Sequence, residues 1–464
     1  MRPKVNIPVK MGEHHTGVVQ EVQYNGQAIV MVDEYPIHLD NAYPNETVTF
    51  EITQVNRKFA RATLVEVVTP SEDRIDSGRD DLLMTGIAPY LNLSYAAQLK
   101  LKQEQVAKIF ERANVPANVA ATIGMEDPTH YRNKTVVPMQ YKDGHLVTGF
   151  IKRGTPDEIV PLEDYFVNDP VIDQVIGLVR DVLDKHQVSI YSDLTEQGEM
   201  RYIMVRRGYY THETMVVLVT QTATLKDEAE IAEEIASVVP GIKSIILNHN
   251  PRSLHLMTSG DNRTLWGADA IHDTLLGIDF EIGPNSFYQV NPQTTEVLYA
   301  LAAEKAELTE NDTVIDAYSG IGTIGLSVAN QVKEVIGVEW VARAVEDAEK
   351  NVANNDITNA RFVTGDAPAQ MKAWHAEGVR PEVVFVDPTR PGLTPELMDA
   401  VVAMRPTRFV YISCNPETMA RDARYMLDQG FVLHGDIQPL DQFPQTAHVE
   451  TVAVFVPGDE TNED

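Results

Sequence analysis

Apolar and polar residues alternate in short runs over the first part of the chain. The runs cover residues 16–20, 27–32, 47–52 and 59–66. A period of two is typical of half-buried β-strands, and turn-forming residues such as Asn25 and Gly26 separate the runs. Several short strands joined by turns favour a small OB-like β-barrel, which we predict over residues 1–68.

The middle of the chain, residues 69–282, mixes the periods of helices and strands. A linker-like stretch opens it, and residues 94–113 then carry apolar side chains at helical spacing. Further strands are predicted at 135–141, 146–151, 200–206 and 214–220, and helices at 170–186 and 227–239. This pattern predicts a central α+β domain, and we expect the helix at 94–113 to pack on the domain that follows.

Strand and helix patterns alternate regularly towards the C-terminus. The predicted strands are 313–317, 334–339, 360–364, 383–386 and 408–412. Helical segments between them imply right-handed crossovers and a mostly parallel sheet, so we predict an α/β Rossmann-like domain over residues 283–458. The last predicted strands, 431–440 and 446–456, have no helix-sized spacer and predict an antiparallel end. Residues 459–464 form an acidic tail.

Charge and cysteine content narrow the function classes. The 464 residues carry a net charge of -30, which argues against a general polyanion binder because phosphate contacts need a basic surface. Basic residues gather locally, however, and we expect a basic strip along the barrel and the middle domain with the acidic residues on the far side.

A single cysteine excludes an internal disulfide and any metal site held by cysteines. No leader-like or membrane-spanning apolar run is found, so we expect a cytoplasmic protein without membrane contact.

The one cysteine, Cys414, follows the predicted strand 408–412 in the sequence Ser413-Cys414-Asn415-Pro416. Open α/β sheets bind ligands beyond the C-terminal ends of their strands. A lone cysteine is nevertheless more often a small buried apolar residue than a nucleophile. Its position alone therefore leaves both interpretations open.

A glycine-rich loop, residues 316–325, follows the first strand of the alternating region and opens a helix. Gly320, Gly322 and Gly325 form a Gly-x-Gly-x-x-Gly pattern, which allows a tight turn close to a ligand, and Glu339 could hold two ribose hydroxyls. On this loop alone, a dinucleotide and S-adenosylmethionine are comparable candidates.

Later strand ends favour methyl transfer. Asp387 and Arg390 follow one predicted strand, Cys414 the next, and Glu450 lies on the final hairpin. Hydride transfer needs no such nucleophile. Methylation at C5 of uracil does: a thiolate adds at C6, C5 then takes an electrophilic methyl group, and a base removes the C5 proton. Cys414 and Glu450 could supply the thiolate and the base.

Five motifs in order resemble those of the RNA (uracil-5-)-methyltransferases that use S-adenosylmethionine; they are residues 287–291, 316–325, 387–392, 413–422 and 441–450. The resemblance implies that Cys414 is the nucleophile and Glu450 the proton acceptor, with Asp387 and Arg390 in contact with the target uracil. It also implies a pocket for cofactor and base lined by Gln289, Tyr318, Gly320, Gly322, Thr323, Glu339, Asp366 and Asp387.

The N-terminal barrel resembles the TRAM domain, a small RNA-binding barrel. This resemblance implies structured RNA as the partner and favours 23S ribosomal RNA over transfer RNA, because the transfer-RNA members generally lack the domain. RNA contacts are expected from Phe287, Arg132, Lys134, Arg57 and Lys58.

Two departures from the family pattern stand out. Thr85 and Ala88 occupy positions where many ribosomal members carry iron–sulfur cysteines, so no cluster is expected. Thr389 replaces the proline or alanine that is common in its loop.

Three other functions stay open: a transfer-RNA methyltransferase, a non-catalytic RNA-binding or ribosome-assembly factor, and a nicotinamide oxidoreductase. We expect a monomer.

Overall fold

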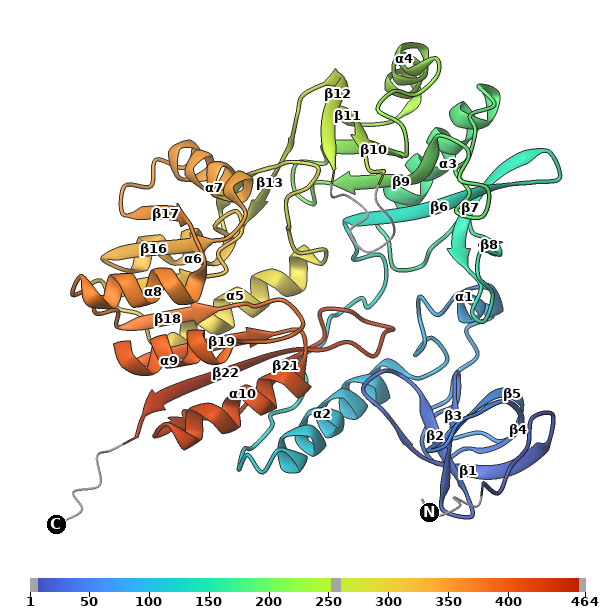
Figure 1. Cartoon of the computed structure of the whole chain (residues 1–464), viewed down its shortest axis with the longest axis horizontal. Coiled ribbons are helices and arrows are strands. Elements are labelled where there is room, and N and C mark those ends of the chain that lie inside the picture. The colour runs from blue at the N-terminus through green and yellow to red at the C-terminus, as the bar shows by residue number, and fades with distance from the viewer. Residues whose placement is uncertain (1–6, 252–259, 459–464) are drawn as a thin grey trace.

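The computed structural model describes residues 7–251 and 260–458, so the predicted acidic tail lies outside the described residues. Within these ranges the strands form a closed barrel, a seven-stranded sheet, an eight-stranded sheet and a two-stranded hairpin. Figure 1 shows the barrel in blue at the lower right, the seven-stranded sheet in green above it, and the eight-stranded sheet in orange and red at the left.

The N-terminal part is a closed barrel, as the alternation predicts, with the strand order β1-β2-β3-β5-β4. Its strands are β1 (His14–Val22), β2 (Ala28–Val32), β3 (Tyr35–Leu39), β4 (Thr47–Val55) and β5 (Ala60–Thr69). Strand β3 was not predicted. It is short and contains a proline, which is a weak strand signal, yet its alternate residues Tyr35, Ile37 and Leu39 are buried in the barrel.

The seven-stranded sheet occupies the middle of the chain, in the order β12-β11-β10-β9-β6-β7-β8. Its strands are β6 (Lys134–Lys142), β7 (His145–Ile151), β8 (Ile159–Pro161), β9 (Met200–Arg207), β10 (Thr214–Thr220), β11 (Ile242–His249) and β12 (Asp261–Gly267). Three helices belong to this part: α1 (Asp80–Thr85), α3 (Pro170–Lys185) and α4 (Glu228–Val238). Helices α3 and α4 cover one face with apolar side chains such as Val175 and Ile235. On the other face, Met204 and Val217 join the core of the C-terminal part.

The C-terminal sheet has the order β17-β16-β15-β18-β19-β22-β20, and β21 pairs with β22. Its strands are β15 (Thr313–Ala317), β16 (Glu334–Glu339), β17 (Ala360–Thr364), β18 (Val383–Val386), β19 (Arg408–Ser413), β20 (Phe431–Leu433), β21 (Gln438–Leu440) and β22 (Glu450–Pro457). Neighbours among β15 to β19 are parallel, and β22 is antiparallel to β19, as predicted.

Helices cover both faces of the C-terminal sheet. On one face lie α5 (Pro292–Ala306), α6 (Thr323–Val328) and α7 (Ala342–Asn354), and on the other α8 (Ala367–Ala376), α9 (Pro395–Met404) and α10 (Pro416–Asp428). A short 3₁₀ turn, η1 (Ala329–Gln331), follows α6, and the hairpin of β13 (Ile271–Leu275) and β14 (Ile278–Ile282) contacts α7. The strand order reverses beside β15, which puts a ligand-binding crevice at the ends of β15 and β18.

Helix α2 (Tyr95–Arg112) connects the barrel to the C-terminal sheet. Val106 and Phe110 of this helix pack in the same core as residues of α10, and Figure 1 shows α2 between α10 and the barrel. The predicted helix at 94–113 therefore packs where it was expected. In the described part of the chain, no helix has the length and apolar character needed to cross a membrane.

The end of the chain departs from the prediction in two places. The predicted strand 431–440 is split into β20 and β21, and β22 begins at Glu450, four residues after the predicted start. The residues between β21 and β22, here called the 441–449 loop, are held by side chains from the N-terminal half of the chain. Because these contacts join residues far apart in the sequence, the local apolar pattern does not show which residues pair.

Candidate active site

Cys414 and Glu450 lie at the ends of two neighbouring strands. The last register pair of β19 and β22 is Ser413 with Thr451, so the next position brings Cys414 opposite Glu450. Residues directly opposite on antiparallel strands have Cβ atoms about 4.5–5.5 Å apart. The hydroxyl of Thr451 also donates to the carbonyl of Ser413 at 3.1 Å. The sheet therefore places the thiol and the carboxyl group side by side.

Burial controls the acid–base state of this site. Glu450 is only 3% exposed, and its Oε2 has no hydrogen-bond partner among the described residues. Burial, followed by the charge of Asp387, raises the pKa of Glu450 well above its ordinary value, and burial raises the pKa of Asp387 to about 7. Two carboxyl groups that disfavour each other's ionisation are suited to holding and passing a proton.

The thiol of Cys414 is held neutral in the protein alone. Burial raises its pKa to about 12, the charges of Glu450 and Asp387 add to the shift, and Arg390 opposes it. The thiolate, not the thiol, is the nucleophile. Positive charge entering the site would therefore favour the reactive thiolate of Cys414.

Hydrogen bonds join the loop of Arg390 to that of Cys414. The carbonyl of Arg390 accepts from Asn415 Nδ2 at 3.0 Å and from Thr418 Oγ1 at 3.3 Å, while the side chain of Arg390 is exposed. Asn415 also caps α10 by accepting from the backbone N–H of Glu417 at 3.2 Å. These bonds link the backbone of the loops that follow β18 and β19.

The glycine-rich loop turns sharply after β15. Tyr318, Gly320 and Gly322 all have positive φ, at 66°, 55° and 87°. A Cβ atom at Gly322 would meet Phe362 Cζ at 2.9 Å, so this position needs glycine for space as well as for conformation. Glu339 closes the loop, since its carboxylate accepts from the N–H groups of Gly320 at 3.1 Å and Val341 at 2.8 Å.

A cavity of about 740 Å³ opens beside this loop. Gly320, Glu339, Val341 and Arg343 line one side, and Phe287, which is 66% exposed, stands on the other. A second cavity, of about 770 Å³, lies in the middle sheet and contains none of the predicted site residues.

Buried polar atoms below the glycine loop fit a cationic, ribose-bearing ligand. Asp316 Oδ1 and Ser319 Oγ are buried without a hydrogen-bond partner among the described residues. Burial raises the pKa of Asp316 to about 7, with further upward shifts from Asp387 and Glu339 and an opposing hydrogen bond from the N–H of Gly325. This acidic surrounding would stabilise a positively charged centre, and Glu339 stands where a ribose could displace its backbone bonds.

The other predicted cofactor residues divide into two groups. Gln289 and Thr323 both lie at the hydroxyl of Tyr299, which is 3.3 Å from Thr323 Oγ1. Burial raises the pKa of this hydroxyl, and the charge of Asp387 raises it further. Asp366 is exposed and caps α8 by accepting from the N–H of Ala369 at 3.1 Å. The structure thus brings Gln289 and Thr323 together, whereas Asp366 stands at the sheet edge.

The predicted RNA residues also separate. Arg132 and Lys134 are half-buried at the start of β6, and the Asn133 between them donates to the carbonyls of Val290 at 2.9 Å and Gln289 at 3.3 Å. This stretch therefore adjoins the 287–291 motif. By contrast, Arg57 and Lys58 are exposed on the turn between β4 and β5.

Lys134 faces another cation. It pairs with Arg206 across β6 and β9, and the guanidinium of Arg206 donates to the carbonyls of Gly283 at 2.7 Å and Ser286 at 2.8 Å. Burial, then Arg206 and Arg132, lower the pKa of Lys134 to about 7. Like charges directly opposite on two strands destabilise a sheet, which favours the neutral form of Lys134.

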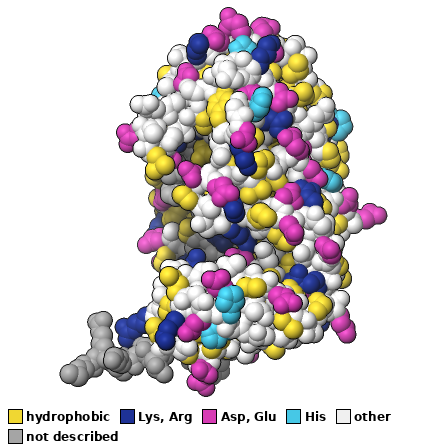
Figure 2. All heavy atoms as spheres, turned by 90° about the vertical axis from the view of Figure 1, so that its right-hand side faces the viewer, with side chains coloured by type: hydrophobic (Ala, Val, Ile, Leu, Met, Phe, Trp, Pro, Cys, Tyr) yellow, Lys and Arg dark blue, Asp and Glu magenta, His cyan; other side chains and the backbone are white. Residues whose placement is uncertain are grey.

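The charge pattern of one face is visible in Figure 2. Acidic and basic side chains are intermixed there, so the expected continuous basic strip does not run along this face. The picture shows a hollow at mid-height with Lys or Arg side chains inside it.

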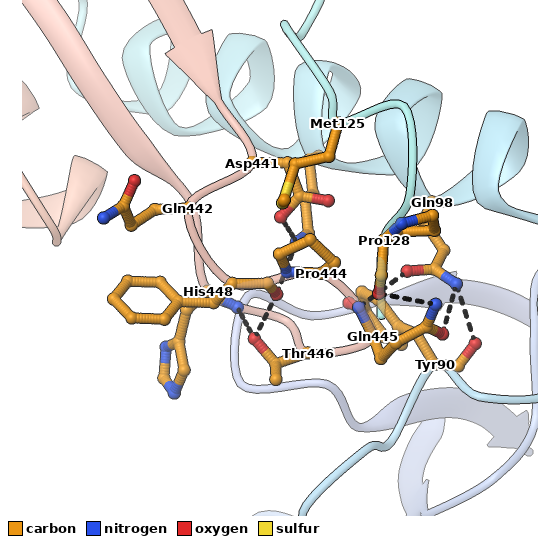
Figure 3. Close-up of polar contacts among 12 residues, drawn as sticks. Tyr90, Gln98, Met125, Pro128, Asp441, Gln442, Pro444, Gln445, Thr446 and His448 are labelled. Atoms are coloured by element: carbon orange, nitrogen blue, oxygen red, sulfur yellow. Dashed lines mark hydrogen bonds and ion pairs between the residues drawn. The ribbon is translucent and has the colours of Figure 1, made fainter. Parts of the chain in front are cut away.

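Sequence reasoning missed the residues that hold the 441–449 loop. Lys102 and Asp441 form an ion pair of 2.5 Å with both side chains fully buried, and Gln98 Nε2 donates to Gln445 Oε1 at 2.9 Å. Figure 3 shows Gln445 of the loop meeting Gln98. A signal existed, because Gln98 and Lys102 lie on the same face of α2 as the buried Leu101 and Val106.

Comparisons with known proteins agree with this geometry. The family model described as tRNA (Uracil-5-)-methyltransferase matches residues 276–456. An "uncharacterized RNA methyltransferase" of Lactiplantibacillus plantarum is 44% identical over 453 residues, which cover 97% of this chain and 99% of that protein. One of the same description from Enterococcus faecalis is 39% identical over 454 residues, covering 97% and 98%.

A solved structure extends the likeness to the whole fold. The tRNA (uracil-54, C5)-methyltransferase of Pyrococcus abyssi, in complex with S-adenosyl-L-homocysteine, aligns with a TM-score of 0.76 and 26% identity. The alignment covers 95% of this chain and 99% of that one, so it spans the barrel as well as the C-terminal sheet.

Proposed function

Because the chain belongs to the RNA (uracil-5-)-methyltransferase family, we propose that it methylates C5 of a uridine in structured RNA through a covalent bond between Cys414 and C6. The observation that carries this proposal is the register of β19 and β22, whose last pair, Ser413 with Thr451, puts Cys414 opposite Glu450 at the next position. We also retain the division into a barrel (1–68), a central RNA-contacting domain (69–282) and a methyltransferase domain (283–458).

The proposed reaction begins at the thiolate of Cys414, which adds to C6 and moves the ring electrons into an enolate. C5 then bonds the methyl group of the donor, whose sulfur keeps the electron pair of the broken S–CH3 bond. Glu450 accepts the C5 proton, the enolate re-forms, and its electrons break the bond between Cys414 and C6. The raised pKa of Glu450 suits it to this step, because a weaker acid is a stronger base.

The methyl donor is S-adenosylmethionine, which supplies an electrophilic methyl group on a positively charged sulfur. Gly320 and Glu339 would hold its ribose side, and Asp316, Gln289 and Asp387 would face its charged end. The entering positive charge would lower the pKa of Cys414, so the thiol would ionise only when donor and substrate are both in place.

Two contacts would position the target base. Asp387 and Arg390 can hydrogen-bond to the uracil edge, and the charge of Arg390 opposes the rise in the pKa of the Cys414 thiol. Phe287, exposed at the cavity, can stack on a base that has left its helix.

Backbone phosphates would bind at Arg132, Lys134 and Arg206. The attraction is electrostatic. A phosphate favours the charged form of Lys134, which burial disfavours, and it balances the two like charges across β6 and β9. Arg57 and Lys58 would then contact RNA farther from the reacting base.

We propose 23S ribosomal RNA as the target, on the resemblance of the barrel to the TRAM domain. A specific observation favours a second candidate, transfer RNA: the Pyrococcus abyssi enzyme that aligns over the whole chain, barrel included, is named for uracil 54 of tRNA. The barrel by itself therefore does not separate the two.

The test is methylation of both RNA classes. Purified protein, S-adenosylmethionine carrying a labelled methyl group, and ribosomal or transfer RNA from a deletion strain would be combined, and labelled 5-methyluridine mapped by mass spectrometry. We expect label in 23S RNA and none with C414A. Label in tRNA alone would support the second candidate, and label in neither would support a non-catalytic RNA-binding factor.

A further inference from the structure

The barrel reaches directly into the candidate active site. Tyr24 lies on the turn between β1 and β2, is 8% exposed, and packs in the core of the C-terminal sheet rather than in that of the barrel. Its hydroxyl donates to the backbone carbonyl of Cys414 at 2.8 Å, across 390 positions of sequence. Its ring meets His448 edge to face, with centroids 6.5 Å apart.

The turn that carries Tyr24 is held from several sides. Gln105 on α2 donates to the carbonyls of Val22 at 2.8 Å and Gln23 at 3.2 Å. Gly26, at a φ of +83°, comes so close to the 441–449 loop that a Cβ atom there would lie 3.3 Å from Ala447 Cβ. The hydroxyl of Tyr24 is therefore fixed in place before any RNA binds.

Cys414 needs such support because of its position. It stands between the last residue of β19 and Asn415, the cap of α10, so it lies one position beyond the last register pair of the sheet and before the helix begins. A carbonyl held at 2.8 Å fixes the peptide plane, and through it the direction in which the thiol leaves the backbone.

We propose that Tyr24 is a positioning residue for the nucleophile, so that docking of the barrel completes the active site rather than only tethering RNA. This inference rests on the proposed function, in which Cys414 attacks C6. It predicts that loss of one hydroxyl on the barrel slows the addition step while RNA still binds. Burial raises the pKa of the Tyr24 hydroxyl most, and the charges of Arg390, Glu450 and Cys414 also act on this pKa.

The matched variants are Y24F and Y35F in the full chain. Each removes a tyrosine hydroxyl that donates to a backbone carbonyl, but Tyr35 bonds to Asn56 inside the barrel, at 2.5 Å. RNA containing 5-fluorouridine, supplied with S-adenosylmethionine, would trap the covalent adduct, because fluorine cannot leave C5 as a proton once C5 is methylated. The measured quantities are the adduct rate at saturating RNA and the RNA concentration that gives half that rate.

We expect Y24F to lower the saturating rate about tenfold, with the half-saturating concentration changed less than about threefold, and Y35F to match the wild type. A wild-type rate in Y24F, a loss confined to RNA affinity, or an equal loss in Y35F would overturn the inference.

A second measurement is independent of methyl transfer. Cys414 is the only cysteine, so its alkylation by iodoacetamide can be followed by intact mass without RNA or donor. We expect alkylation of Y24F to be at least about threefold faster than in the wild type, because the thiol loses its fixed orientation, and Y35F to be unchanged. If the wild type forms no adduct with 5-fluorouridine RNA, the proposed function fails; if alkylation is the same in all three proteins, the positioning role fails.

Discussion

The buried ion pair between Lys102 and Asp441 gives a sharp test of how the 441–449 loop is held. Both side chains are fully buried, the ammonium also donates to the carbonyl of Phe443 at 3.2 Å, and Asp441 Oδ2 has no further partner among the described residues. Burial lowers the pKa of Lys102 and the contact with Asp441 opposes that shift, so the amine depends on its partner for its charge. Loss of either partner leaves the other charge buried and unpaired.

The expected magnitude follows from that burial. Removing one member of a buried pair costs about 3–5 kcal/mol, whereas replacing both by uncharged groups costs much less. K102M and D441N should each lower the free energy of opening the 441–449 loop by this amount. The double variant K102M/D441N should lower it less than either single variant, because no buried charge remains.

The assay is hydrogen exchange of peptides covering the 441–449 loop, read by mass spectrometry. A cost of about 3–5 kcal/mol corresponds to exchange faster by roughly two to three and a half orders of magnitude. The matched control is K100M on the same helix, since Lys100 is 77% exposed and its contact with Glu104 is 4.0 Å long, and it should exchange like the wild type. The reasoning is refuted if each single variant changes exchange by less than about tenfold, or if the single effects simply add in the double variant.

Three further predictions concern the chemistry. E450Q should add to uridine and methylate it but fail to release it, so a methylated RNA–protein adduct should accumulate on denaturing gels; free 5-methyluridine at the wild-type rate would contradict this. Because Lys134 loses its proton above about pH 7 and a bound phosphate favours the charged form, RNA affinity should fall as pH rises, by up to about tenfold per unit, and K134R should give a flatter profile in binding titrations. Equal slopes for both proteins would exclude the phosphate site. Alkylation of wild-type Cys414 should be slow near neutral pH and rise steadily beyond about pH 9, because burial and two carboxyl groups favour the neutral thiol; a plateau below that pH would disprove the electrostatic account.

Much of the C-terminal fold could be predicted from the sequence. Strands β15 to β18 begin and end where the apolar runs do, because buried parallel strands are continuous apolar segments bounded by turns. The glycine-rich loop was also recognisable, since backbone with positive φ favours glycine, and Glu339 was recognisable as an acidic residue at the end of the next strand. In the middle sheet, β11 was not predicted, because a short apolar run between turns fits a buried helix as well as a strand.

Local sequence patterns could not predict the contacts that complete the candidate site. Tyr24 follows an alternating strand like many turn residues, and nothing near it in sequence indicates that it meets Cys414. Lys102 left a partial signal, as a charged residue on the apolar face of a helix, but its partner lies 339 positions away. Pairings of this kind are set by how the domains pack, which a single sequence does not encode locally.

The central claim is that the sulfur of Cys414 bonds to C6 of a uridine and that Glu450 then removes the C5 proton. The most direct measurement is tandem mass spectrometry of the protease- and nuclease-digested complex formed with 5-fluorouridine RNA and S-adenosylmethionine. The account predicts one peptide, containing residue 414, that carries a methylated fluorouridine on its sulfur. Attachment at any other residue, or no attachment under conditions in which unmodified RNA gains 5-methyluridine, would contradict it.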